Sequence, residues 1–145
     1  AERPDDADAQ RDLGHAYIQK IFVSNDVEKG RWSMMADATY DKALAIDDHH
    51  WSARFSKAVN YSFMPPVFGM QPKAVEHFEI LLGQQEAQSP QPRFAETYSY
   101  LGNLYANQGK QKRARETWAR GAELFPRHEE LRKRLEDAGG PGEQE

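Results

Sequence analysis

The chain has 145 residues, a formal net charge of −4 and 39% hydrophobic residues, a composition typical of an ordinary globular domain and not of a disordered chain. It contains no cysteine, which excludes disulfides, thiolate metal sites and cysteine nucleophiles. No run approaches the roughly 18 apolar residues of a membrane-spanning helix, so we expect no direct membrane insertion.

The sequence leaves the compartment open. The first ten residues, AERPDDADAQ, lack the charged and then apolar build of a signal peptide. Because the chain starts at Ala1 and not at a methionine, we expect a processed form or an excised domain of a longer protein. We therefore expect a soluble chain whose localisation is unknown.

A first pair of helices is predicted within residues 5–48. Its first helix carries DLGHAY at 12–17 and its second carries ADATYDKALAIDD at 36–48. The apolar and small residues of these segments recur three and four apart, which is the spacing of one helix face. The segment between them, IFVSNDVEKGRWSMM at 21–35, is longer than an ordinary turn, so we expect an extended connection.

A second, weaker pair is predicted within residues 49–86. WSARFSKAVNY at 51–61 and KAVEHFEILL at 73–82 have the same three- and four-residue spacing. The connection between them, SFMPPVFGMQPK at 62–73, is again long. The two long connections hold every methionine of the chain, which is unusual for segments that normally carry polar turn residues.

The third pair, within residues 92–126, repeats the pattern most completely, in YLGNLY and ARETWARGAELFP. Gly109 stands where its first helix should stop, and Pro126 closes the second. A glycine inside a helix is about 1 kcal/mol less favourable than alanine, so we expect Gly102 to be kept as a close contact between two helices.

Beyond Pro126 we predict a capping helix at 127–137, anchored by Leu131 and Leu135, followed by a flexible tail at 138–145. Residues 110–134 are rich in lysine and arginine, but glutamates are interleaved with them. That mixture indicates a solvated helix face, so we expect no nucleic-acid partner.

The three copies share a series of positions: Leu13-Gly14 corresponds to Leu101-Gly102, Tyr17 to Tyr105, Ala36 to Ala114, and Tyr40 to Trp118. This series resembles the tetratricopeptide repeat (TPR) family, whose unit is about 34 residues long. The resemblance implies an all-α fold: a right-handed superhelix of three stacked antiparallel helix pairs plus a C-terminal capping helix. It implies one domain over 5–137, with repeats at about 5–48, 49–86 and 92–126.

The resemblance also implies a function, since members of this family generally bind partners in the concave groove lined by the first helix of each repeat. Carried over to this sequence, the expected peptide-binding residues are Arg11, His15, Arg54, Lys57, Asn60, Tyr100, Asn103 and Asn107. Amide side chains can bond an extended peptide backbone, and the basic ones favour an acidic ligand. Arg11, His15 and Arg54 occupy places of the carboxylate-clamping residues of chaperone-binding members, but Glu96 and Tyr100 replace the basic pair of the third repeat.

The alternative is a self-associating or assembly scaffold. It would use a Met/Phe-rich loop edge made by Trp32–Met35 with Met64–Met70, whose candidate contact residues are Trp32, Met64, Val67, Phe68 and Met70. The same side chains could instead bury against one another and extend the core. A third option is an accessory module in an assembly pathway such as cytochrome c maturation, where similar repeats occur.

We expect no enzyme, metal or cofactor. The sequence contains no phosphate-binding glycine loop, no His-Glu helix motif and no nucleophile motif. DDHH at 47–50 contains metal-ligating residue types, but it falls in the turn between repeats, where Asp48 or its neighbour is expected to cap the next helix. No histidine is tied by spacing to the methionines, which disfavours a thioether copper site.

Overall fold

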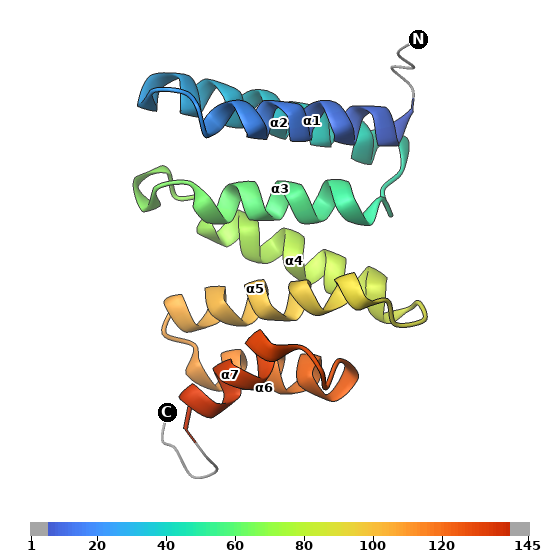
Figure 1. The fold of residues 1–145 in the computed structure, drawn as a ribbon, viewed down its shortest axis with the longest axis vertical. Helices are drawn as coiled ribbons and strands as arrows, with labels where there is room; N and C mark the ends of the chain where they lie inside the picture. The colour runs from blue at the N-terminus through green and yellow to red at the C-terminus, as the bar shows by residue number, and fades with distance from the viewer. Residues whose placement is uncertain (1–5, 140–145) are drawn as a thin grey trace. The chain divides into compact units, whose positions relative to one another are not determined.

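The computed structural model describes residues 6–139, and all of their regular structure is helical, which confirms the predicted all-α class (Figure 1). The described residues form α1 (Ala7–Ile21), α2 (Asp26–Ile46), α3 (Trp51–Phe63), η1 (Pro66–Phe68), α4 (Gln71–Glu86), η2 (Pro92–Phe94), α5 (Ala95–Asn107), α6 (Gln111–Leu124) and α7 (Glu129–Asp137), where η marks a short 3-10 helix. Residue 5, where the predicted domain starts, and residues 140–145 of the predicted tail lie outside this range.

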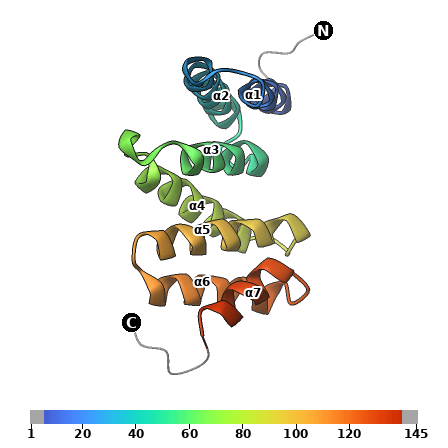
Figure 2. The ribbon, with the colours of Figure 1, turned by 60° about the vertical axis from the view of Figure 1, so that its left-hand side comes forward.

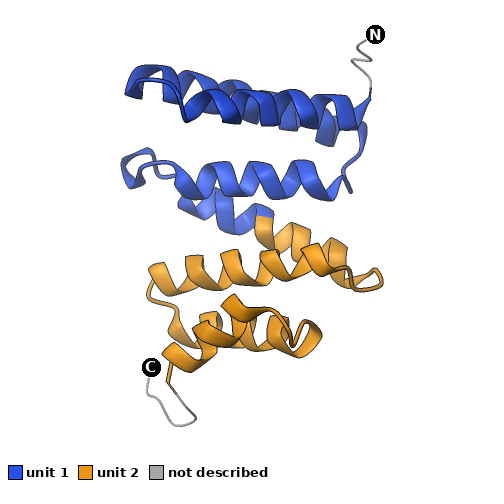
Figure 3. Ribbon diagram, viewed as in Figure 1, with its two compact units in different colours: residues 1–77 blue, residues 78–145 orange. Residues whose placement is uncertain are grey.

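The chain divides into two compact units, residues 1–77 (unit 1) and 78–145 (unit 2), with the boundary inside α4 (Figure 3). Unit 1 contains α1, α2, α3 and the first part of α4. Unit 2 contains the rest of α4 with α5, α6 and α7.

In unit 1, α1 and α2 form an antiparallel hairpin, and α3 packs against α2 (Figure 1). A glycine brings the hairpin helices together: a Cβ on Gly14 would lie 2.5 Å from the ring of Tyr40, which is fully buried. Tyr40 belongs to a small apolar core with Ala36, Ala43 and Ala53. Close packing of backbone on an aromatic ring therefore compensates for the lower helix propensity of glycine.

The structure corrects the predicted first connection. α2 already begins at Asp26, because Asn25 and Glu28 form a capping box in which each side chain bonds the backbone of the other residue. Only residues 22–25 connect the helices, and the predicted loop residues Trp32–Met35 lie on α2. The extra length of the first repeat is therefore helix and not loop.

The second connection is a loop, as predicted. α3 ends at Phe63, the short helix η1 follows, and Gly69 turns the chain with a φ of 64° before α4 begins. That left-handed conformation suits glycine, which has no Cβ to clash with the backbone.

In unit 2, α5 and α6 form the second hairpin, and α7 packs against α6 (Figure 2). A Cβ on Gly102 would overlap the ring of Trp118, so Gly102 has the predicted contact role. Gly109 has a φ of 79° just beyond α5, which confirms it as the stop between the two helices. A Cβ on Gly121 would lie 2.6 Å from Cβ of Tyr98, so α6 meets α5 closely at two places.

Two histidines cap helices. The Nδ1 of His50 accepts from the backbone N–H of Ala53 at the start of α3, and the Nδ1 of His128 accepts from Leu131 at the start of α7. Asp48, one of the expected capping residues, is bound to the Arg54 side chain instead. None of the described helices combines the length and the apolar character needed to cross a membrane.

Candidate functional site

The predicted binding residues on α3 lie inside unit 1. Arg54 is 5% exposed, and its guanidinium donates to the Asp48 carboxylate at 2.7 Å and contacts the His77 ring at 3.1 Å. Its Nε has no hydrogen-bond partner in the described part of the chain. Arg54 therefore holds the turn before α3 against α4, and little of it can meet a ligand.

Lys57 is also buried and is surrounded by oxygen atoms. Its Nζ lies 2.5 Å from a carboxylate oxygen of Asp37, 2.8 Å from one of Asp41 and 2.8 Å from the Tyr61 hydroxyl. Burial by itself would lower the pKa of this ammonium, but the hydrogen bonds to Asp37 and Asp41 outweigh it and raise the pKa. The ammonium is charged and satisfied within the chain.

Asn60 uses both ends of its amide on one residue of α2. Its Oδ1 accepts from the Ser33 hydroxyl at 2.8 Å and its Nδ2 donates to the Ser33 carbonyl at 3.1 Å. These bonds, together with those of Lys57, join α3 to α2. Three of the predicted ligand-binding residues of unit 1, namely Arg54, Lys57 and Asn60, therefore have hydrogen-bond partners within the unit.

Arg11 and His15 on α1 are more accessible. The Nε of Arg11 lies 2.6 Å from the carboxylate of its neighbour Asp12, and the His15 Nε2 lies 2.8 Å from the hydroxyl of Ser56 on α3. Burial and then the charge of Arg11 lower the pKa of His15. These two side chains remain on the surface of unit 1, next to the first helix of the second repeat.

In unit 2 the predicted residues follow one stripe of α5. Tyr100 stacks on Phe78 with ring centroids 5.6 Å apart, Asn103 accepts from the indole N–H of Trp118 at 3.2 Å, and Asn107 is exposed. Glu96 begins the same stripe, since residues three and four apart share a helix face. Burial and then the charge of Glu96 raise the pKa of the Tyr100 hydroxyl.

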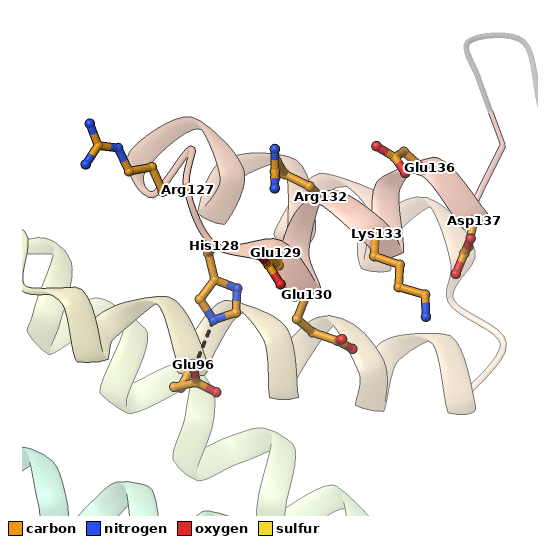
Figure 4. A pocket seen from close by; sticks show the side chains of 9 residues that line it. All are labelled: Glu96, Arg127, His128, Glu129, Glu130, Arg132, Lys133, Glu136 and Asp137. Atoms are coloured by element: carbon orange, nitrogen blue, oxygen red, sulfur yellow. Dashed lines mark hydrogen bonds and ion pairs between the residues drawn. The ribbon is translucent and has the colours of Figure 1, made fainter.

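A hollow of about 930 Å³ opens between Glu96 of α5 and the polar side of α7 (Figure 4). Its lining is almost wholly charged: Glu96, Arg127, His128, Glu129, Glu130, Arg132, Lys133, Glu136 and Asp137. The Nε2 of His128 lies 2.9 Å from a carboxylate oxygen of Glu96 and closes one end of the hollow. Figure 4 shows Lys133 extending from α7 on the far side of the hollow from Glu96, while Arg127 points away from the other lining side chains.

Three cationic side chains around this hollow have no hydrogen bond or ion pair with any described residue: Arg127, Arg132 and Lys133. The prediction placed these residues on a capping helix and gave them no binding role. Their sequence offers no signal for one, because glutamates at helical spacing could have paired with all of them. Only the structure indicates that these charges are available.

The predicted loop-edge residues divide between two environments. Trp32 is half-buried, stacks on Tyr17 with centroids 5.9 Å apart and donates its indole N–H to Ser24. Met64 and Met70 are half-buried, whereas Val67 and Phe68 are exposed. The option of burial thus fits Trp32, and the option of a contact surface fits Val67 and Phe68.

The exposed side chains of this region form a larger set than the sequence predicts. We define the apolar patch of unit 1 as Phe22, Val23, Val27, Phe63, Val67 and Phe68, each between 66% and 87% exposed. These side chains belong to the two helix connections and to the helix ends beside them, and both connections lie at the same end of unit 1 (Figure 1). Ser33 and Asn60 bridge α2 and α3. Phe22, Val23 and Val27 were missed because they precede the methionines that drew the prediction.

The described residues contain no group of three or more His, Cys, Asp or Glu side chains placed to hold a metal ion. The DDHH segment is spread over different partners: His50 bonds Asp8 at 2.7 Å and Asp48 bonds Arg54.

No protein-family model matches the chain, and no curated protein matches it in sequence. Solved structures do match. A thermophilic TPR protein from Thermus thermophilus has a TM-score of 0.73 and 20% identity, over 93% of this chain and 64% of that one. The chain thus spans less than two thirds of that structure. The N-terminal domain of stress-induced protein-1 from C. elegans has a TM-score of 0.71 and 23% identity, over 92% of this chain and 94% of that one. The chain therefore has the fold of tetratricopeptide repeat proteins, which the spacing of its Leu-Gly and aromatic residues predicts.

Proposed function

We propose that the chain is a non-catalytic protein-interaction module that binds an extended peptide or a partner helix, with α5 and α7 of unit 2 as its main contact surface. The observation that carries the proposal is the hollow beside α5 and α7, whose volume of about 930 Å³ is in the range of ligand sites. Its charged lining suits a polar segment of a protein more than a small apolar ligand.

The proposed contacts in unit 2 come from two helices. Asn107 on the α5 stripe is exposed and can both donate to and accept from a peptide backbone. Arg132 and Lys133 on α7 lack internal side-chain partners among the described residues and favour carboxylates of the ligand. Glu96 and Glu136, in the same lining, would select against a ligand that is acidic throughout.

In unit 1 we retain Arg11 and His15 as a separate candidate contact surface, since both are partly exposed. We exclude three residues from the proposed contact surface, Arg54, Lys57 and Asn60, because their polar atoms are bound to side chains and backbone of the same unit. We assign these three residues to the stability of the fold.

The test begins with peptides selected from a random display library against the immobilised chain, which are then synthesised and titrated by calorimetry. We expect Lys133→Glu and Asn107→Ala to weaken the selected peptides, by about tenfold and threefold respectively, since interface residues that matter contribute about 1 kcal/mol or more. Lys112→Glu, an equal charge change at an exposed position of α6, should leave the affinity unchanged. Peptides that bind all three variants as they bind the wild type would contradict the proposed surface.

The alternative, a self-associating scaffold, depends on the exposed apolar side chains of unit 1. It predicts that the wild-type chain sediments as a dimer or larger species and that Phe68→Glu returns it to the monomer. A monomeric wild type at all concentrations tested would exclude this alternative.

A further inference from the structure

We propose that the apolar patch of unit 1 is a second interaction surface, separate from the hollow in unit 2, and that it binds a partner segment carrying apolar side chains flanked by acidic ones. Large exposed apolar patches on a soluble domain mark interaction sites. The six side chains of the patch are largely exposed, and aromatic residues such as Phe22, Phe63 and Phe68 contribute much of the energy of protein interfaces.

The apolar surface continues along α2. Val27, Arg31 and Met34 are spaced four and three residues apart and so lie on one face of the helix, and Val27 and Met34 are 86% and 72% exposed. A partner that covers Val27 therefore also meets the cation of Arg31. From Val27 to Met34 this stripe is about 10 Å long, the length of about two turns of a helix.

The charges around the patch identify the partner's chemistry. The segments 20–34 and 62–73 contain four cationic and two acidic side chains, on a chain whose formal net charge is −4. The chain itself engages both acids: Asp26 pairs with Lys29 at 3.3 Å, and Glu28 closes the capping box with Asn25. The surplus positive charge resides on Lys20, Arg31 and Lys73.

Two of these cations are already held in place. The Nζ of Lys20 lies 4.5 Å from the centroid of the Trp32 ring, and the guanidinium carbon of Arg31 lies 5.4 Å from it. Cations that rest on an aromatic ring are partly ordered before a ligand arrives, which reduces the entropy lost on binding. Carboxylates of a partner would find them next to the apolar contacts.

A second copy of the chain fits this surface less well. Contact across a two-fold axis places the same patch, with the same surplus of positive charge, on both sides, so the two surfaces repel each other. An anionic membrane also fits less well, since Val27 lies between the carboxylates of Asp26 and Glu28 and would carry them to the headgroups. A peptide can place its acids opposite Arg31 and Lys73 and avoid that repulsion.

The test uses a fluorescein-labelled probe peptide of about 16 residues with leucine and phenylalanine at helical spacing and glutamate elsewhere. Fluorescence anisotropy should show saturable binding to the full chain. We expect Phe68→Glu to weaken binding by about tenfold or more, since it places a carboxylate within the apolar contact. Arg31→Glu should weaken it by about fivefold at low salt and less at high salt, because salt screens exposed charges.

Matched controls lie on α2, toward the end of that helix opposite Val27. Ile46→Glu changes an exposed apolar side chain to the same charge, and Lys42→Glu makes a charge change equal to that of Arg31→Glu; both should bind the probe as the wild type does. A second peptide, with every glutamate replaced by lysine, should bind at least about tenfold more weakly than the probe.

Three results would overturn the proposal. The first is equal binding of the glutamate and lysine peptides. The second is a wild-type dimer that Phe68→Glu dissociates, in a chain that does not bind the probe. The third is co-sedimentation with phosphatidylserine-containing vesicles in the absence of probe binding. Because the patch is tested at Phe68 and Arg31, none of these results bears on Lys133 and Asn107, and the proposed function is tested independently.

Discussion

The two units pack their helix hairpins in the same way but differ in where their polar and apolar side chains lie. Both hairpins set a glycine against an aromatic ring, Gly14 on Tyr40 and Gly102 on Trp118. Unit 1, however, buries the charged Arg54 and Lys57, whereas the polar residues buried in unit 2 are neutral. Of the ten large hydrophobic side chains exposed among the described residues, nine belong to unit 1.

This contrast distinguishes the side chains of unit 1 that stabilise the fold from those that remain available for binding. A buried charge is a weak source of stability, because the energy of removing it from water opposes its attraction to its partner. The exposed phenylalanines and valines of unit 1 contribute nothing to its interior. Unit 1 therefore keeps a more polar interior and a more apolar surface than folding alone requires, and a partner that covers the apolar patch accounts for the surface.

The largest expected effect follows from breaking the buried charge network of unit 1. Lys57→Met leaves the Asp37 and Asp41 carboxylates without their cation, and removing one partner of a buried ion pair typically destabilises by about 3–5 kcal/mol. Because Asp41 is largely exposed, we expect about 3 kcal/mol, measured as the free energy of unfolding in urea. Lys42→Met, at an exposed site of the same helix as Asp41, should change it by less than about 0.5 kcal/mol. A similar loss in both variants would contradict the role assigned to Lys57.

Replacing a glycine by alanine should have opposite effects on stability at two sites: it should destabilise the fold where the glycine contacts another helix and stabilise it where the glycine has open space around it. Gly102→Ala places a methyl group in the Trp118 ring and should destabilise by about 1–3 kcal/mol, as overpacking does. Gly83→Ala on α4 meets no atom within 4 Å and should stabilise by up to about 1 kcal/mol through helix propensity. Thermal denaturation followed by circular dichroism measures both. If Gly102→Ala also stabilises, the close contact between α5 and α6 is wrong.

The neutral polar pair of unit 2 should be less sensitive than the charged network of unit 1. The Thr97 hydroxyl donates to the side-chain amide oxygen Oε1 of Gln85 at 2.9 Å, and the Nε2 of Gln85 donates to the backbone carbonyl of Phe94 at 3.0 Å. Thr97→Val removes one neutral hydrogen bond and should lower the free energy of unfolding by about 1 kcal/mol. A loss as large as that of Lys57→Met would mean that the two interiors do not differ in the way their charges indicate.

The smallest effect is a dependence on pH that arises in unit 1. Burial, and then the charges of Arg11 and Lys57 respectively, lower the pKa values of His15 and His77 from the ordinary 6.5. The unfolded chain therefore takes up protons before the folded chain does as the pH falls below 6.5, so stability present at neutral pH is lost in that range. We expect the urea midpoint to fall from about pH 7 to about pH 5, and the variant with both His15→Gln and His77→Gln to show a shallower fall. An unchanged slope in that variant would assign the effect to other groups.

The sequence predicts the features that depend on local geometry. Gly102 and Gly109 stand at positions where a contact and a turn are needed, and the structure confirms both. The predicted start of α2 is too late, because the apolar residues around Trp32 resemble a loop edge when the capping box at Asn25 is not taken into account.

The sequence does not predict which polar side chains are buried. Lys57 looks like a groove residue until its partners are known, and Asp37 is 20 residues away on another helix. Conversely, Arg132 and Lys133 look paired on a helix rich in glutamate, and only their positions leave them available. Exposure of a charged side chain depends on tertiary contacts, and helical spacing does not contain that information.

Each of the two capping histidines also links the helix that it caps to the first helix of the preceding hairpin. The Nδ1 of His50 accepts from the start of α3, and its Nε2 lies 2.7 Å from a carboxylate oxygen of Asp8 in the first turn of α1; His128 joins α7 to Glu96 of α5 in the same way. The residue that begins a helix thereby also fixes where that helix begins relative to the first helix of the preceding hairpin. The same pair of residues could be used in design. An engineered array could be lengthened by giving each added hairpin a carboxylate in the first turn of its first helix and a histidine at the N-cap of the helix that follows the hairpin.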